Sequence, residues 1–224
     1  ALDAGEFILA PGVQDMMAAL LARKVGFDFI YASGYWLTAS AYGMPDAGLV
    51  TLTQMLDRLA HLMAVSEAGV IADADTGFGG LVNVRQTVRG YEAAGVAAIQ
   101  IEDQEFPKRC GHTGHKRLAP LAECVNRIRV AADARRDPDN MLVIARTDAI
   151  AVEGFDAALE RLARFADAGA DILFLEAPTD VEQMRTACAE LDRPLLANMA
   201  DGGLTPILDA VSLQAIGYRL AIFP

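Results

Sequence analysis

Residues 69–103 read GVIADADTGFGGLVNVRQTVRGYEAAGVAAIQIED. Two short apolar runs, at residues 69–75 and 97–103, enclose a longer stretch in which apolar residues recur at helical spacing. Each run is apolar almost throughout, as is typical of strands that are buried on both faces. A strand, a helix and a second strand in this order predict parallel pairing through a right-handed crossover.

The same alternation continues along the whole chain. We expect eight strands, at residues 7–13, 27–33, 69–75, 97–103, 141–147, 172–177, 194–199 and 218–224. No linker or shift in composition divides them, so residues 1–224 are expected to form one domain. Eight such units predict an α/β fold of the (β/α)8 TIM-barrel type. The alternative is a doubly wound open sheet, but its usual glycine-rich phosphate loop is absent after the first strand, where residues 11–15 read PGVQD.

The last expected strand reaches Pro224, so the eighth helix of a barrel is absent from this chain. Without that helix, the outer faces of the neighbouring strands would be bare. We therefore expect a barrel that is truncated after its eighth strand.

The composition limits the classes of partner. The 224 residues include 19 Lys and Arg against 30 Asp and Glu, which gives a formal net charge of −11 and argues against nucleic acid as the main partner. Three cysteines are too few for a disulfide scaffold, and a reducing cytoplasm is the simplest location. The longest stretch without charge, residues 29–45, is too short and too broken to span a bilayer. No basic segment followed by an apolar one opens the chain, so no secretory signal is expected.

Polar side chains gather where the expected strands end: Tyr31, Ser33, Asp73, Asp75, Glu102, Asp103, Arg146, Glu176 and Asn198. Barrel enzymes place their catalytic groups at this rim, so the set predicts an active site. Asp73 and Asp75 are two residues apart and should share one face of their strand. Two carboxylates this close repel each other unless a cation lies between them, and Glu102 can add a third. Oxygen ligands alone favour Mg²⁺ or Mn²⁺ over zinc.

The segment 107–117, PKRCGHTGHKR, reverses the local charge of an acidic chain, and we call it the basic segment. Cations near the thiol of Cys110 would lower its pKa and make it usable as an acid, a base or a nucleophile. They would also attract a polycarboxylate or phosphorylated substrate. Lys116 and Arg117 are expected to be solvated, whereas Cys124 and Cys188 lie in helical patterns and are expected in the core.

Four motifs together resemble the isocitrate lyase/phosphoenolpyruvate mutase superfamily: IADADTGFG (71–79), IEDQEFPKRCGH (101–112), ARTDA (145–149) and LLANM (195–199). The resemblance covers essentially the whole chain, and KRCGH is specific to the lyase branch. It implies a (β/α)8 barrel, dependence on Mg²⁺, and cleavage of a C–C bond in a hydroxylated di- or tricarboxylate. It also implies a homotetramer whose subunits exchange their eighth helices.

The resemblance implies a role for each matching residue. Asp75 would be the main Mg²⁺ ligand, and the water ligands would be held by Asp46, Asp73 and Glu102. The carboxylate of the α-keto acid would be bound by Tyr31, Ser33 and Gly34. Lys108 and the proton donor Cys110 would lie on a mobile lid, and Arg146 would pair with substrate oxygens. The second product's carboxylate, or the groups that support it, would be contacted by Gly111, His112, Glu176 and Asn198, and His112 would help Arg146 to stabilise developing charge.

The chain departs from the methylisocitrate lyase pattern after Gly34, where Tyr35 and Trp36 replace small residues. Bulky groups there favour a smaller or more apolar diacid, of the alkylmalate type, as the substrate. Two alternatives remain open: a phosphorus-transferring mutase that acts on carboxyphosphonoenolpyruvate, and a barrel that binds ligands without catalysis.

Overall fold

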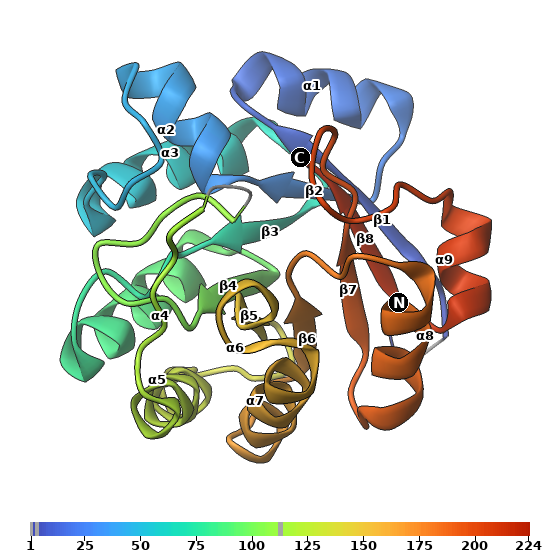
Figure 1. Ribbon diagram of the computed structural model, residues 1–224. Helices are drawn as coiled ribbons and strands as arrows, with labels where there is room; N and C mark the ends of the chain where they lie inside the picture. The colour runs from blue at the N-terminus through green and yellow to red at the C-terminus, as the bar shows by residue number, and fades with distance from the viewer. Residues whose placement is uncertain (1, 3–4, 112–113) are drawn as a thin grey trace.

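The computed structural model describes residues 2, 5–111 and 114–224, and it confirms the barrel. Eight parallel strands close in sequence order, and β1 pairs with β8. They are β1 (Ile8–Val13), β2 (Phe29–Ala32), β3 (Gly69–Asp73), β4 (Ala98–Glu102), β5 (Leu142–Thr147), β6 (Ile172–Leu175), β7 (Leu195–Asn198) and β8 (Leu220–Phe223). Figure 1 shows them running round the barrel from blue to red.

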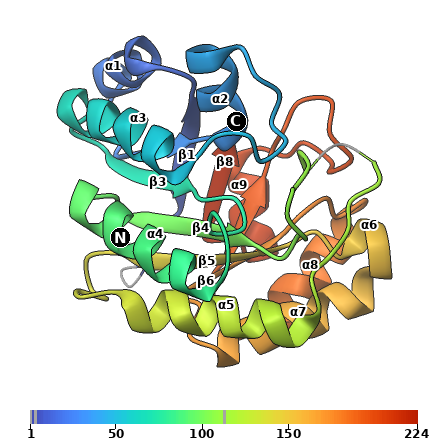
Figure 2. The same cartoon turned by 90° about the vertical axis from the view of Figure 1, so that its left-hand side faces the viewer.

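Helices form the outer layer of the barrel. They are α1 (Met16–Val25), α2 (Gly34–Tyr42), α3 (Leu52–Val65), α4 (Leu81–Ala94), α5 (Leu121–Ala134), α6 (Ile150–Glu153), α7 (Phe155–Asp167), α8 (Val181–Glu190) and α9 (Ala210–Ile216). Figure 2 shows α3, α4 and α5 side by side on the outside of the strands. None of the helices in the described ranges is long and apolar enough to cross a membrane.

Local sequence signals set where the helices begin and end. Asp15 caps α1, because its side chain accepts a hydrogen bond from the N–H of Ala18. Gly26 and Gly95, expected just past helix ends, adopt left-handed conformations there, with φ of 96° and 87°. These turns direct the chain into the strand that follows each helix.

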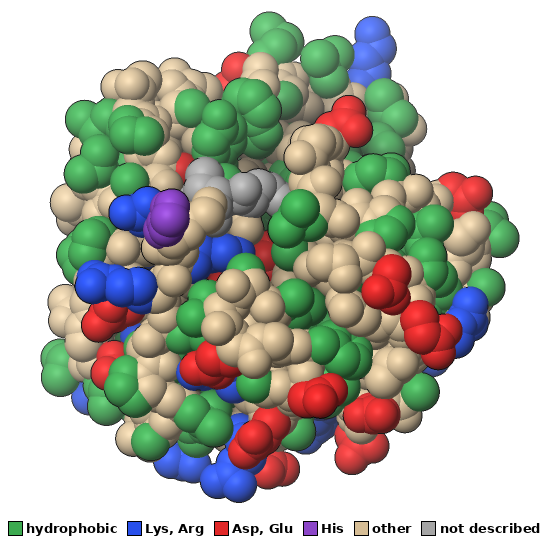
Figure 3. All heavy atoms as spheres, in the orientation of Figure 1, with side chains coloured by type: hydrophobic (Ala, Val, Ile, Leu, Met, Phe, Trp, Pro, Cys, Tyr) green, Lys and Arg blue, Asp and Glu red, His purple; other side chains and the backbone are tan. Residues whose placement is uncertain are grey.

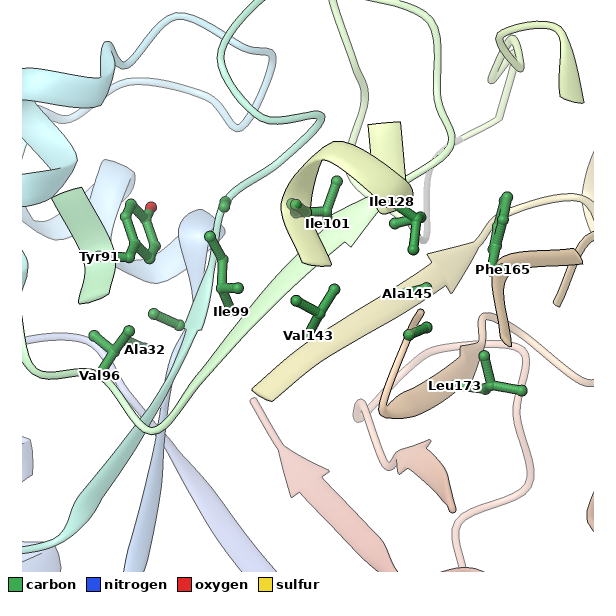
Figure 4. Packing of buried hydrophobic residues seen from close by; sticks show 14 of the residues in the cluster. Ala32, Tyr91, Val96, Ile99, Ile101, Ile128, Val143, Ala145, Phe165 and Leu173 are labelled. Atoms are coloured by element: carbon green, nitrogen blue, oxygen red, sulfur yellow. The ribbon is translucent and has the colours of Figure 1, made fainter. Parts of the chain in front are cut away.

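The core has two parts. One fills the inside of the barrel and includes Tyr31, Ile144 and Phe174. The other lies between strands and helices, where Figure 4 shows side chains of α4, α5 and α7 packed against β4, β5 and β6. Cys124 is buried in this second part, as expected, and Cys188 is half-buried and packs against the same cluster.

The strands are shorter than expected, and this changes the account of Asp75. β3 ends at Asp73, so Asp75 lies in the following turn, with φ of 49°, and not on a strand face beside Asp73. The period-two argument for this pair was therefore wrong, although the turn still brings the two residues together.

Candidate active site

A pocket of about 470 Å³ lies at the carboxyl ends of the strands, within the range usual for small-molecule sites. Ten of the expected site residues line it: Tyr31, Ser33, Asp46, Asp73, Glu102, Lys108, Cys110, Gly111, Arg146 and Asn198. Figure 3 shows basic and acidic side chains inside a hollow near the centre of this face. His112 lies outside the described residues.

The acidic cluster consists of Asp73, Asp75 and Glu102, at the ends of β3 and β4, and of Asp46, from the segment between α2 and α3. The N–H of Asp75 donates to Oδ1 of Asp73 over 3.0 Å, and the N–H of Gly34 donates to Oδ2 over 3.3 Å. A Cβ at position 34 would lie 2.8 Å from Asp73 Oδ2, which explains the glycine. Gly34 was expected at the substrate carboxylate, but here its N–H is directed at Asp73.

Lys108 lies inside this cluster. Its Nζ is 2.5 Å from Asp46 Oδ1 and 2.7 Å from Asp75 Oδ1, and the side chain is only 3% exposed. Lys108 was expected on a mobile lid; in this structure its side chain is buried, and the two carboxylates supply the partners that a buried ammonium needs. Burial alone would lower the pKa of Lys108, but Asp75 and the neighbouring carboxylates raise it well above its ordinary value.

At least one buried carboxylate oxygen of the cluster is available to bind a cation. Glu102 Oε1 is buried and has no hydrogen-bond partner among the described residues. Burial raises the pKa of Asp75 to about 6, although Lys108 opposes the rise. The oxygen-only donor set thus fits a hard divalent ion. However, in the described ranges no three acidic, His or Cys side chains converge as direct ligands, because the ammonium of Lys108 lies among them. An ion held largely through water, as expected for Mg²⁺, is compatible with this spacing.

Tyr31 is held by a residue that the sequence analysis missed. Its hydroxyl donates to Gln100 Oε1 over 2.8 Å, and Gln100 Nε2 donates to Asp73 Oδ1 over 3.3 Å. Burial raises the pKa of Tyr31 well above its ordinary value, so the phenol is neutral. Gln100 lies within β4 and is fully buried, and a single glutamine in an apolar run gave no signal of this role.

Arg146 also lines the pocket and contacts several carboxylates. Its guanidinium donates to Asp148 twice, each over 3.0 Å, and lies 3.2 Å from Glu176 Oε2 and 3.6 Å from Glu102 Oε2. The guanidinium also lies over the ring of Phe174, 5.1 Å from its centroid. Asn198 donates to Glu176 over 3.2 Å. Glu176 therefore contacts Arg146 and Asn198, as a supporting group would.

The basic segment brings Cys110 to the pocket. Cys110 is half-buried and lines the pocket next to Gly111. A Cβ at position 111 would lie 2.1 Å from Arg146 Nη2, so only glycine allows the chain this close to the guanidinium. Lys116 is buried, so its expected solvation is wrong. Arg117 is exposed as expected, with its Nε 2.9 Å from Glu105 Oε2.

This arrangement places buried carboxylates, an arginine and a thiol around one pocket. A family model described as phosphoenolpyruvate phosphomutase matches residues 1–223. The chain belongs to the PEP mutase/isocitrate lyase superfamily.

Named members of the superfamily are similar over the whole chain. The chain is 45% identical to 2,3-dimethylmalate lyase of Eubacterium barkeri over 223 residues, which cover 100% of this chain and 77% of that protein. It is also 45% identical to 2-methylisocitrate lyase of Aeropyrum pernix, covering 100% of this chain and 71% of the relative. These relatives are carbon–carbon lyases, as the resemblance predicted.

Solved structures of the superfamily share the fold. A crystal structure of 2,3-dimethylmalate lyase has a TM-score of 0.94 and 42% identity, over 98% of this chain and 74% of that one. A phosphonopyruvate hydrolase in complex with oxalate and Mg²⁺ has a TM-score of 0.86 and 32% identity, over 99% and 76% of the two chains. A divalent metal is thus bound by a member of this superfamily.

Proposed function

We propose that this chain is a divalent-metal-dependent carbon–carbon lyase that cleaves a 2-hydroxy di- or tricarboxylate into an α-keto acid and a carboxylate. The observation that carries the proposal is one pocket lined by the buried carboxylates of Asp73 and Glu102 together with Arg146 and Cys110, with Asp75 hydrogen-bonded to Asp73. The names of the relatives support the reaction class.

The pocket residues would have three separate roles: metal binding, binding of the keto-acid carboxylate, and stabilisation of developing charge. Asp46, Asp73, Asp75 and Glu102 would hold Mg²⁺, or Mn²⁺ in its place, which when bound supplies positive charge to the oxygens of the α-hydroxy acid. Tyr31 and Ser33 would bind the carboxylate of the nascent keto acid. Arg146 would stabilise the charge that develops on the second carboxylate.

Cys110 would complete the cleavage. The 2-hydroxyl passes its proton to a carboxylate of the acidic cluster and becomes a carbonyl as the C–C bond breaks, and the bonding electrons pass to the carbon beside the second carboxylate. That carbon takes its proton from the thiol of Cys110 as general acid. The basic segment would exclude water, which would otherwise quench the carbanion.

The test is a screen of malate, 2-alkylmalates and methylisocitrate for keto-acid release with Mg²⁺. Phosphonopyruvate and carboxyphosphonoenolpyruvate serve as comparison substrates, because the matching family model is described as a phosphomutase. Keto-acid release without any phosphorus compound supports the lyase. Turnover of the phosphorus compounds alone would replace it with the mutase, and no turnover would favour a non-catalytic barrel.

Substrate size gives a prediction at Tyr35 and Trp36. Their rings line the pocket and meet edge to face, with centroids 5.0 Å apart. We expect 2-alkylmalates to have a higher kcat/KM than methylisocitrate, and a double Tyr35→Gly, Trp36→Gly variant to shift the preference toward the tricarboxylate by about 10- to 100-fold. Steady-state kinetics on both substrates measures the shift. No shift, or one in the opposite direction, would remove the reason to prefer the smaller diacid.

We also propose that the protein is a cytoplasmic homotetramer with exchanged C-terminal helices. Exposed apolar side chains on α1 support an interface, since Met17, Leu21 and Val25 are 64%, 56% and 73% exposed. Light scattering should give the mass of a tetramer, and a Leu21→Lys, Val25→Lys variant should lower it. A monomeric parent protein would contradict the assembly. Cys124 and Cys188 are free thiols, and free thiols are typical of proteins in a reducing compartment such as the cytoplasm.

A further inference from the structure

Lys116 is a buried lysine in an otherwise exposed stretch. Residues 114, 115 and 117 are exposed, whereas the side chain of Lys116 is only 3% exposed. Its Nζ lies 2.8 Å from Asp148 Oδ1 and donates to the carbonyl oxygen of Gly111 over 2.6 Å. Since a buried ammonium is stable only with such partners, these two contacts fix where the side chain lies.

Asp148 is itself held rigidly at the end of β5. It is fully buried, and its two carboxylate oxygens accept hydrogen bonds from Nη2 and Nε of Arg146. Its own N–H donates to Asp103 Oδ1 over 3.0 Å. Burial alone would raise the pKa of Asp148, but the charges of Arg146 and Lys116 lower it to about 2. One carboxylate thus joins the pocket arginine to a lysine of the basic segment.

The other partner of Lys116 belongs to the pocket wall. Gly111 follows Cys110 directly, and its Cα lies so close to Arg146 that a Cβ would meet Nη2 at 2.1 Å. The carbonyl of Gly111 is held by Lys116. The chain next to Cys110 is therefore fixed through its carbonyl and packed against the guanidinium.

We propose that Lys116 is a positioning residue that, together with Asp148, clamps the Gly111 carbonyl to the end of β5 and so holds Cys110 at the pocket beside Arg146. Lys116 touches no reacting atom in this scheme and acts through Gly111 and Cys110. Its effect on catalysis rests on the proposed lyase function, whereas the clamp itself does not.

The experiment compares Lys116→Met with Arg117→Met. Methionine keeps the length of the side chain and removes the charge, and Arg117 is the adjacent, exposed cation of the same segment. The rate of alkylation by iodoacetamide is followed at each cysteine by mass spectrometry. Cys124 and Cys188 should react slowly in every variant, because burial raises their pKa values to about 11 and about 12.

We expect Lys116→Met to raise the alkylation rate of Cys110 by about 10- to 100-fold, the factor that loss of one or two charge-assisted hydrogen bonds supplies. Arg117→Met should leave it within about twofold of the parent rate. In the same preparations, kcat for keto-acid release should fall by about 10-fold or more in Lys116→Met, with a smaller change in KM. A melting temperature measured alongside excludes global unfolding as the cause.

An unchanged alkylation rate in Lys116→Met, equal to that of Arg117→Met, overturns the clamp. If Lys116→Met lowers the melting temperature, Lys116→Gln is used instead, because its amide can still donate to the Gly111 carbonyl. That variant should show a smaller increase in the same direction, and no increase overturns the clamp. A parent protein without lyase activity but with the expected alkylation pattern would contradict the proposed function and leave the clamp supported.

Discussion

Replacement of Asp75 by alanine should lower keto-acid release by about 10³-fold or more, and added Mg²⁺ should not restore it. Asp75 lies at the centre of the acidic cluster: its N–H donates to Asp73 and its Oδ1 lies 2.7 Å from the ammonium of Lys108. If this carboxylate is the main ligand of the ion, the substrate oxygens lose the positive charge on which cleavage depends. Steady-state kinetics with graded Mg²⁺, together with calorimetry of Mg²⁺ binding, measures both effects.

Chelation gives the matching test on the unchanged protein. EDTA should abolish activity, and excess Mg²⁺ should restore it. Asp57→Ala is a suitable control, because it removes an exposed carboxylate of α3 that lies outside the pocket. Full activity in the chelated enzyme would contradict the assignment of the cluster. So would an Asp75→Ala variant that binds Mg²⁺ with unchanged affinity.

The fold was largely predictable because parallel strands buried on both faces are continuous apolar runs. The expected strand at residues 27–33 contains Phe29–Ala32, and glycines such as Gly26 and Gly95 marked the preceding helix ends. Helix α2 was not anticipated. It lies in the charge-free stretch 29–45, where no polar face gives a helical period to detect.

Many of the residues that line the pocket were predictable, but the contacts among them were not. Motifs named the residues around the pocket, because barrel strands deliver their carboxyl ends to one rim. Which charges pair depends on tertiary distances that the local sequence does not encode. Lys108 and Lys116 both lie in a stretch that looks solvated, but both side chains are buried. Lys108 pairs with Asp46 and Lys116 with Asp148, and each carboxylate is at least 32 residues away in the chain. Asp148 could have been noticed, since it stands two residues after Arg146 in the ARTDA motif.

Replacement of Cys110 by serine should lower kcat by about 10²- to 10⁴-fold and change KM far less. Serine preserves the shape of the side chain, so the packing of Gly111 against Arg146 should persist. Its hydroxyl is a much weaker acid than a thiol, so proton delivery to the carbanion becomes slow. Steady-state kinetics on the best substrate of the screen measures both constants, and Cys188→Ser, on helix α8, is the control for removal of a thiol elsewhere.

The split between kcat and KM decides what Cys110 does. A group that donates a proton only as the C–C bond breaks stabilises the transition state and not the bound substrate, so its loss appears in kcat. If KM rises instead with kcat unchanged, Cys110 binds substrate and the proton comes from another group. A Cys110→Ser enzyme with both constants near normal would mean that the thiol only lines the pocket and has no catalytic role. The carboxylate cluster and Arg146 would then have to support cleavage with a different acid, such as one of the hydroxyls that line the pocket, among them Tyr31.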